Sequence, residues 1–289
     1  MIVTTGTSGF IGSHLLKAIN TDEEVVCCDV RGTNVLRPDA LLTLLKTNRP
    51  SVIYHLGAIS STTETNTSQI SMHNILFSSQ LLEYCIANNV PIVYASSASV
   101  YGLGEHGFRE DTHLTPLNYY AISKTSFDQF VAQKIKDNPT AKVYGLRYFN
   151  VYGENEEHKQ DMASPVHKFF EQSKQNGVIR VFEGSEDFYR DFVYVRDIVD
   201  ITLAIAKSEK PGIYNVGSGI ATSFMEVAQH VSRITNAKIT KIPFPNHLAG
   251  KYQKYTCSDN SKITAAGISQ SRTSIEEGIE SVYANRKNK

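Results

Sequence analysis

The stretch Gly6-Thr7-Ser8-Gly9-Phe10-Ile11-Gly12 constrains the fold of this chain more than any other feature. It follows Ile2-Val3-Thr4-Thr5, an apolar and β-branched run that predicts a buried strand, and it leads into a predicted helix over residues 13–19. Glycines three apart permit a tight turn, close approach of the backbone to a phosphate, and close packing of helix on strand. Free amides at the helix start would then face a pyrophosphate, so we predict a dinucleotide-binding turn.

An acidic residue at the end of the second predicted strand supports this interpretation. That strand covers Glu24 to Cys28 and ends at Asp29, the distance at which a carboxylate meets the ribose hydroxyls of a bound dinucleotide. Asp29 favours NAD, because its charge would repel a 2′-phosphate, whereas Arg31 could pair with that phosphate. We therefore predict NADP or NAD as cofactor and leave the choice open.

Strands and helices alternate through the first half of the chain. We predict a short helix over residues 40–46 with Asp39 as its cap, and a long helix over residues 69–87. Further strands are predicted at residues 51–56, 91–95 and 142–147. This alternation predicts an α/β fold, namely a Rossmann-type doubly wound parallel sheet.

The second half is less regular. The polar stretch Glu154 to Asp161 is predicted to be a loop. Helices are then predicted at 162–175, from Asp197 and from Ser223, and strands at 179–182, 192–195, 213–216 and 239–242. These pieces are too mixed to extend a regular sheet. We therefore predict a cofactor domain of residues 1–153 and a smaller C-terminal α/β substrate-binding region of residues 154–289, interleaved with the first.

Charge and cysteine content exclude several classes of protein. The chain has 29 Lys and Arg against 29 Asp and Glu, so no overall field attracts nucleic acid or an anionic membrane. No apolar run reaches membrane-spanning length, and the N-terminal apolar run is too short for a signal sequence. The four cysteines show no paired metal-binding spacing, so we expect buried thiols, no metal and a cytoplasmic location.

Tyr120 and Lys124 stand four residues apart, where two side chains share one face of a helix. Phe127, Phe130 and Val131 continue an apolar stripe at helical spacing, which supports a helix there. An ammonium beside a phenol favours the phenolate, so this pair could move protons at neutral pH.

Three further segments are predicted to lie at the carboxyl ends of strands, where sites form in open α/β sheets. Ser97 follows the strand at 91–95 and could hydrogen-bond a substrate oxygen beside Tyr120. Leu56 and the small residues Gly57-Ala58-Ile59-Ser60 are suited to lie against a cofactor. The amide of Asn74 could tie backbone segments together near it.

Taken together, the stretches 5–12, 120–124 and 147–153 resemble the extended short-chain dehydrogenase/reductases that act on nucleotide sugars. The resemblance runs nearly from end to end of the chain. Within that family, the stretches 55–64, 157–164, 182–186, 190–195 and 242–245 are most similar to the ADP-L-glycero-D-manno-heptose 6-epimerases. The resemblance implies a nucleotide-diphosphate sugar as substrate, and we expect a homo-oligomer.

Roles follow from the resemblance position by position. Tyr120 matches the catalytic base, Lys124 the lysine that tunes it, and Ser97 the catalytic serine. Lys159, which otherwise looks like a solvated charge in an acidic loop, matches a second catalytic base. Besides Tyr120 and Lys124, the implied cofactor contacts are Phe10, Ile11, Asp29, Val30, Leu56, Gly57, Ala58, Ile59, Ser60, Asn74 and Val151. The implied substrate contacts beyond Ser97 are Asn150, Phe182, Glu183, Gly184, Ser185, Arg190 and Tyr252.

The family's reaction is epimerisation by transient oxidation with a tightly bound, recycled cofactor. Hydride returns to the opposite face of the carbon, which is a reason for a second acid such as Lys159. That role requires Glu156 and Glu157 to point outward, because their charges would otherwise raise the pKa of the lysine. The chain departs from the family at Gly153-Glu154-Asn155-Glu156, where Gly-Pro-Arg-Glu is usual.

Two other departures are a shorter segment between Asp29 and Ser51, and Asp161 and Lys168 where the family has serine and histidine substrate contacts. Three other functions share parts of this pattern. A 4-epimerase needs only the serine, tyrosine and lysine. A 4,6-dehydratase would need an Asp-Glu pair where this chain has Ala98-Ser99. A cofactor-binding regulator without catalysis would need none of the catalytic residues.

Overall fold

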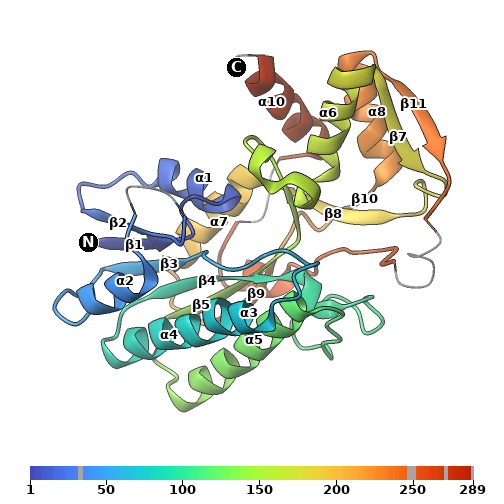
Figure 1. The fold of residues 1–289 in the computed structure, drawn as a ribbon. Coiled ribbons are helices and arrows are strands. Elements are labelled where there is room, and N and C mark those ends of the chain that lie inside the picture. The colour runs from blue at the N-terminus through green and yellow to red at the C-terminus, as the bar shows by residue number, and fades with distance from the viewer. Residues whose placement is uncertain (32–34, 246–251, 270–272, 288–289) are drawn as a thin grey trace.

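A parallel sheet organises the computed structural model, which describes residues 1–31, 35–245, 252–269 and 273–287 (Figure 1). Within these ranges the sheet has six strands in the order β2-β1-β3-β4-β5-β9. The strands are β1 (Ile2–Thr5), β2 (Val25–Cys28), β3 (Val52–His55), β4 (Ile92–Ser97), β5 (Val143–Tyr148) and β9 (Gly212–Val216). The predicted α/β fold with a doubly wound parallel sheet is confirmed.

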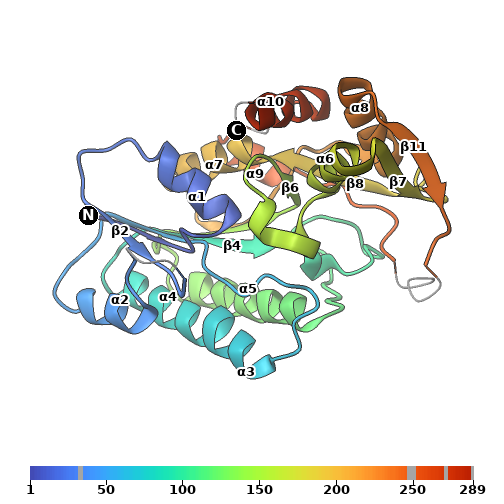
Figure 2. The ribbon, with the colours of Figure 1, turned by 45° about the horizontal axis from the view of Figure 1, so that its top comes forward.

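Helices cover both faces of this sheet. Helices α1 (Phe10–Ala18) and α7 (Val195–Ile205) lie on one face (Figure 2). Helices α2 (Pro38–Leu44), α4 (Phe77–Ala87) and α5 (Tyr119–Asp137) lie on the other. Because both faces are covered, the strands are buried and largely apolar, and Val3, Ile53 and Ile92 are fully buried. No helix in the described ranges is both long and apolar enough to cross a membrane.

The strand order reverses at β1, which pairs with β2 on one side and with β3 on the other. Between Asp29 and Ser51 the described residues form no further strand, and a single bridge joins Cys28 to Leu36. The short segment seen in the sequence therefore leaves β2 at the edge of the sheet. In open α/β sheets, ligands bind at the carboxyl ends of the strands where the order reverses, which here is the crevice between β1 and β3.

A smaller region stands beside the main sheet, toward the right of Figure 1. Its sheets join β10 (Ala221–Ser223) to β8 (Tyr189–Tyr194) and β6 (Asn150–Tyr152), and β11 (Lys238–Ile242) to β7 (Val178–Phe182). Its helices are α6 (Pro165–Asn176), α8 (Phe224–Thr235) and α10 (Ile275–Lys287). They enclose an apolar core of their own that includes Phe169, Ile179 and Val227. The short helix α9 (Ser261–Ala265) packs near β9 instead.

One prediction about the second half is wrong, because β9 extends the main sheet. It pairs in parallel with β5, so that Tyr144 lies opposite Gly212 and Tyr148 opposite Val216. The apolar side chains of α7 pack on this part of the sheet. The helix itself forms part of the crossover connection that leads to β9. The predicted domain boundary at residue 153 stays a prediction.

Two helix predictions need correction. The long helix begins earlier, as α3 (Thr67–Ile70), and passes through a π-helical stretch, η1 (Ser71–Leu76), before α4. Asp39 does not cap α2, whose N-cap is Arg37 with Pro38 as first residue. Proline suits that position because its fixed φ fits the helix and it has no N–H to leave unpaired. Asp39 lies in the first turn, where a carboxylate is favoured by the helix dipole.

Candidate active site

The glycine turn after β1 has no room for side chains. Gly6 has φ of 73°, and a β-carbon there would lie 2.6 Å from the backbone nitrogen of Gly57. A β-carbon at Gly12 would lie 2.1 Å from the carbonyl oxygen of Gly6. The Gly9 amide donates a 3.0 Å hydrogen bond to the same carbonyl. Glycine is therefore required where the turn, the start of α1 and the loop after β3 meet.

The start of α1 and Asp29 border this turn. The N-cap of α1 is Gly9, and among described residues no side chain caps the helix. Asp29 accepts hydrogen bonds from the backbone amides of Ser8 (2.9 Å) and Arg31 (3.0 Å), which holds its carboxylate beside the turn. Arg31 and Val30 are exposed at the same edge. A cradle without side chains, uncapped amides and a carboxylate together fit a dinucleotide.

Asn74 ties the loop after β3 to helix α5. Its side chain accepts from the Ile59 amide at 2.8 Å and donates to the Ile59 carbonyl at 3.0 Å. It also donates to the Ser123 hydroxyl at 3.0 Å. The π-helical stretch places Asn74 inside the fold, where it is 1% exposed. These bonds tie the loop from Leu56 to Ser60 to α5, and the place of Asn74 near a cofactor stays a prediction.

Tyr120, Lys124 and Ser97 meet at the carboxyl end of β4. Helix α5 starts just before Tyr120, with Asn118 as N-cap accepting from the Ala121 amide at 2.9 Å. The Lys124 ammonium donates to the Ala95 carbonyl at 2.7 Å and lies 5.9 Å from the ring centroid of Tyr120. The Ser97 hydroxyl lies close enough to the phenol of Tyr120 to lower its pKa. The structure thus brings together the three residues predicted from separate segments.

Burial dominates the ionisation of this group. It lowers the pKa of Lys124 to about 8, against the charge of Asp128, which raises it. Burial also raises the pKa of Tyr120, while the nearby Ser97 hydroxyl lowers it and the charge of Asp128 raises it further. The charge of Lys124 is not among the causes of this raised pKa, and its ammonium is hydrogen-bonded to the Ala95 carbonyl. Proton transfer by this pair stays a prediction.

Lys159 is partly buried, with 23% of its side chain exposed. It belongs to the 3₁₀ stretch η3 (Glu157–Met162). Its ammonium lies 2.9 Å from a carboxylate oxygen of Glu156 and 4.6 Å from the ring centroid of Phe10. The expectation that Glu156 points outward is wrong, because its carboxylate also accepts from the Gly153 amide and from the amide and hydroxyl of Ser164. Glu156 thus joins the end of β6 to the start of α6.

Glu154, which departs from the family pattern, is buried between α1 and α7. One carboxylate oxygen accepts from the Tyr194 hydroxyl at 2.6 Å and from Arg196 at 2.9 Å, and the other lies 3.8 Å from His14. Burial raises the pKa of Glu154, but the nearby imidazole of His14, the hydrogen bond from Tyr194 and the charge of Arg196 outweigh it and bring the pKa to about 2. This departure serves to join the two helices.

Arg190 is buried on β8. Its guanidinium donates to the Tyr189 carbonyl at 2.8 Å and lies 5.2 Å from the ring centroid of Tyr252 and 5.5 Å from that of Phe224. Burial lowers its pKa. Across the described part of the chain, no carboxylate forms an ion pair with it. A buried cation of this kind suits an anionic ligand.

An aromatic cluster adjoins Arg190. The ring centroids of Phe182 and Phe244 are 5.6 Å apart, and those of Phe188 and Tyr252 are 5.1 Å apart. Sequence reasoning assigned no role to Phe188 or Phe244. Phe188 stands two residues before Arg190, and this spacing in an extended segment places both side chains on one side. That signal could have identified it.

The remaining predicted substrate residues are spread over several elements. Glu183 and Gly184 follow β7, with Gly184 at φ of 80°, and Ser185 is buried beside them. Asn150, the first residue of β6, accepts a 3.4 Å hydrogen bond from Thr256.

The other predicted residues are Val151, Asp161 and Lys168. Val151 is half-buried in β6. Asp161 and Lys168 are exposed, and the Lys168 ammonium donates to the Asp161 carbonyl at 2.7 Å. No contact joins these two residues to Arg190 within the described ranges.

The sequence matches the NAD dependent epimerase/dehydratase family over residues 2–217. The chain belongs to this family. Curated heptose epimerases named ADP-L-glycero-D-manno-heptose-6-epimerase match it over 96% of its length and 95% of theirs, with 37% identity in Brachyspira hyodysenteriae and 40% in Alkalilimnicola ehrlichii. The crystal structure of the Helicobacter pylori enzyme of that name is similar with a TM-score of 0.84 and 27% identity, covering 98% of this chain and 95% of that one. The protein is an enzyme of the epimerase class with NAD or NADP as cofactor.

His55, the last residue of β3, supports the floor of the site. Its ring nitrogens share hydrogen bonds with the hydroxyls of Thr5 (2.7 Å) and Ser78 (2.8 Å). Burial lowers the pKa of His55 to about 3, and the charge of Lys124 lowers it further. The imidazole is therefore neutral in the folded protein at neutral pH.

We expect this histidine to make stability fall in mild acid. Unfolded His55 gains a proton below a pKa of about 6.5, whereas folded His55 stays neutral down to about pH 3. Its stabilising contribution is full above pH 6.5 and falls by ~1.4 kcal/mol for each pH unit below it. Urea unfolding at pH 7, 6 and 5 should therefore show the free-energy difference between wild type and His55→Gln shrinking as pH falls. The exposed His113→Gln serves as the control, and a difference for His55→Gln that is constant with pH would contradict the prediction.

Proposed function

We propose that this enzyme epimerises a nucleotide-diphosphate sugar, specifically ADP-glycero-manno-heptose at carbon 6, by transient oxidation with a tightly held NAD or NADP. Relatives of that name are 37% and 40% identical to the chain over 96% of its length. The observation that carries the proposal is the position of Lys159. Its ammonium lies 4.6 Å from the ring centroid of Phe10, the first residue of α1, and is therefore close to the turn proposed to hold the cofactor.

The cofactor would be held by the glycine turn, the amides at the start of α1, Asp29 and the loop from Leu56 to Ser60. When bound, it supplies the hydride acceptor of the oxidation and the hydride donor of the return step. The Asn74 side chain keeps the loop in place against α5. Asp29 would meet the ribose hydroxyls.

Tyr120 would take the proton from the substrate hydroxyl during oxidation. Only the phenolate can accept that proton, and because burial raises the pKa of the phenol, its own proton must first leave to solvent, which creates the negative charge. The Lys124 ammonium, with a pKa of about 8, is mostly charged at pH 7 and stabilises that charge. The Ser97 hydroxyl would hydrogen-bond the same substrate oxygen.

Lys159 would protonate the oxygen after the sugar has turned over. The Glu156 carboxylate lies 2.9 Å from its ammonium and fixes its orientation. The backbone beside it is strained, since Asn155 has φ of 64° and Gln160 has φ of 47°. Such conformations cost about 1–3 kcal/mol each and concentrate at functional sites, which supports a role for this segment.

Arg190 and the adjoining aromatic cluster would bind the nucleotide diphosphate. The buried guanidinium matches the charge and geometry of a diphosphate. Phe182, Phe188 and Tyr252 offer flat surfaces suited to a nucleobase. Both groups are held on the smaller region, so substrate would lie between it and the main sheet.

We also propose that the enzyme is a homo-oligomer. Met72 and Leu76 on η1 and Tyr119 and Ile122 on α5 are between 45% and 56% exposed, and these two helices pack side by side. Neighbouring exposed apolar side chains of this kind are typical of protein interfaces. The proposed cytoplasmic location is supported by the free cysteines, which suit a reducing compartment.

Replacing apolar residues on this face should dissociate the assembly. The 32.1 kDa chain should sediment above its monomer mass, and Ile122→Lys combined with Met72→Lys should reduce that mass, because two buried charges would oppose association. Ile220→Lys, at an apolar residue that is 64% exposed elsewhere, is the matched control. A wild-type protein that sediments as a monomer would refute the proposal.

Tyr120→Phe should abolish turnover with little change in cofactor affinity. Loss of general acid–base catalysis lowers rates by ~100-fold or more, and the change removes one hydroxyl from the helix face that also carries Lys124. Initial rates and calorimetric cofactor titration measure the two effects. Tyr84→Phe, which loses a hydroxyl bonded to the Asn48 carbonyl, should behave as wild type. Unchanged turnover in Tyr120→Phe would exclude this tyrosine from the mechanism.

Lys159→Met should strongly slow epimerisation of an ADP-linked heptose while folding and cofactor binding persist. The expected loss is ~100-fold or more, since the return step would lack its proton donor. Product stereochemistry is read by NMR on a panel of nucleotide sugars, with the exposed Lys174→Met as control. A wild-type rate in Lys159→Met, or inversion at carbon 4 by both proteins, would indicate a 4-epimerase instead.

A further inference from the structure

A buried carboxylate lies one helical turn beyond Lys124. Asp128 on α5 is 1% exposed, and Arg147 from β5 donates to its Oδ2 at 2.8 Å. The Tyr94 hydroxyl from β4 donates to its Oδ1 at 2.8 Å. The carboxylate is therefore fixed from two strands, on the same side of the helix as Lys124.

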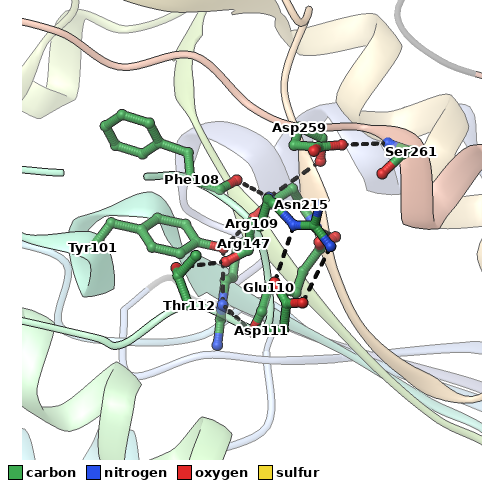
Figure 3. Close-up of polar contacts among 10 residues, drawn as sticks. All are labelled: Tyr101, Phe108, Arg109, Glu110, Asp111, Thr112, Arg147, Asn215, Asp259 and Ser261. Carbon is green, nitrogen blue, oxygen red and sulfur yellow. Dashed lines mark hydrogen bonds and ion pairs between the residues drawn. The ribbon is translucent and has the colours of Figure 1, made fainter. Parts of the chain in front are cut away.

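The same arginine reaches the segment that carries Ser97. Its Nη1 donates to the Tyr101 hydroxyl at 2.8 Å, and that hydroxyl donates to Asn215 Oδ1 at 2.7 Å. Tyr101 ends the short helix η2 (Ala98–Tyr101), which begins directly after Ser97. Figure 3 shows Arg147 and Tyr101 beside Asn215, with residues of the 108–112 loop around them. One guanidinium thus joins α5 to the segment after β4.

Charges facing Lys124 come from a small set of groups. Asp128 and Tyr120 share its helix, His55 approaches from β3 in its neutral form, and Ala95 on β4 presents a carbonyl oxygen. Asp128 raises the pKa of Lys124 and also that of Tyr120.

A buried ion pair is weak evidence of stabilisation, because desolvation offsets much of the attraction. Arg147 and Asp128 have side chains that are 4% and 1% exposed, and apolar residues could fill such a site with similar stability. Stabilisation of the fold therefore does not account for the position of this ion pair next to Lys124.

We propose that Asp128 is a positioning residue for the reaction: its charge, fixed by Arg147 and Tyr94, keeps Lys124 protonated and so sets the pH range of the Tyr120–Lys124 pair. The catalytic part of this inference rests on the proposed function. Without the carboxylate, Lys124 loses its proton at lower pH and Tyr120 also ionises at lower pH. Both changes shift the pH range of activity to lower values. Loss of packing alone would not lower the pH at which either Lys124 or Tyr120 loses its proton.

The test is a titration of Lys124 in Asp128→Asn. The protein is labelled with ¹³C-lysine, and the Lys124 signal is identified by its disappearance in Lys124→Met. Removing an opposite charge that lies one helical turn away in a buried site should lower the titration midpoint of Lys124 by ~1 pH unit or more. The measurement needs no substrate, so its outcome is independent of the proposed reaction. With an active substrate, the pH profile of kcat should move in the same direction.

Tyr148→Phe is the matched control. Tyr148 follows Arg147 on β5, faces the other side of the sheet, and shares a buried 2.7 Å hydrogen bond with Thr202. It should lose stability while the Lys124 midpoint stays in place.

Should Asp128→Asn not fold, the double variant Asp128→Asn with Arg147→Gln leaves neither member of the ion pair unpaired. A smaller downward shift is then expected, because the positive charge of Arg147, which opposes protonation of Lys124, is removed as well. A wild-type midpoint in either folded variant would overturn the proposal, even if the melting temperature falls. The Lys124 midpoint could also shift although the wild-type protein is inactive on every nucleotide sugar. That result would support the effect of the Asp128 charge on Lys124 and overturn only the proposed substrate.

Discussion

Close backbone contact at the carboxyl end of β1 is the constraint on which the site depends. The turn at Gly6 touches the loop at Gly57, and the start of α1 at Gly12 touches the turn. A single β-carbon would push these three segments apart. Their spacing is therefore set by backbone atoms, which a change of side-chain rotamer cannot relieve. The hydroxyl of Thr5 and the imidazole of His55 then complete the junction with directed hydrogen bonds. The proposed cofactor crevice is therefore lined by closely packed backbone, whereas the groups proposed to bind the substrate lie on the smaller region.

Local patterns could be predicted from the sequence, because residue type and spacing carry them directly. The glycine turn, Asp29, and the pairing of Tyr120 with Lys124 on one helix are of this kind. The π-helical stretch around Asn74 could not, since one extra residue per turn leaves no mark in a hydrophobic pattern. Nor could the place of β9 beside β5, because the partner of a strand is decided by contacts far away in sequence.

Burial of charged side chains also could not be predicted from the sequence. Glu156 reads as one more acid in a polar loop, yet it is fully buried and accepts four hydrogen bonds. Asp128 likewise has no sequence signal that separates it from a solvated helix residue. Burial depends on the tertiary fold, and it also decides the direction in which the pKa of Tyr120 moves. A sequence pattern therefore identifies catalytic residues more readily than the groups that govern their ionisation.

The return of the chain to the main sheet at β9 has a consequence for how the protein is made. When β5 leaves the ribosome its outer edge has no partner, and the whole stretch from β6 to α7 must be synthesised before β9 can pair with it. Unpaired strand edges on nascent chains are sites of aggregation, and pairing between distant segments is slow. The nascent chain therefore passes through a vulnerable interval, in which a chaperone that shields the edge of β5 would raise the yield of native protein.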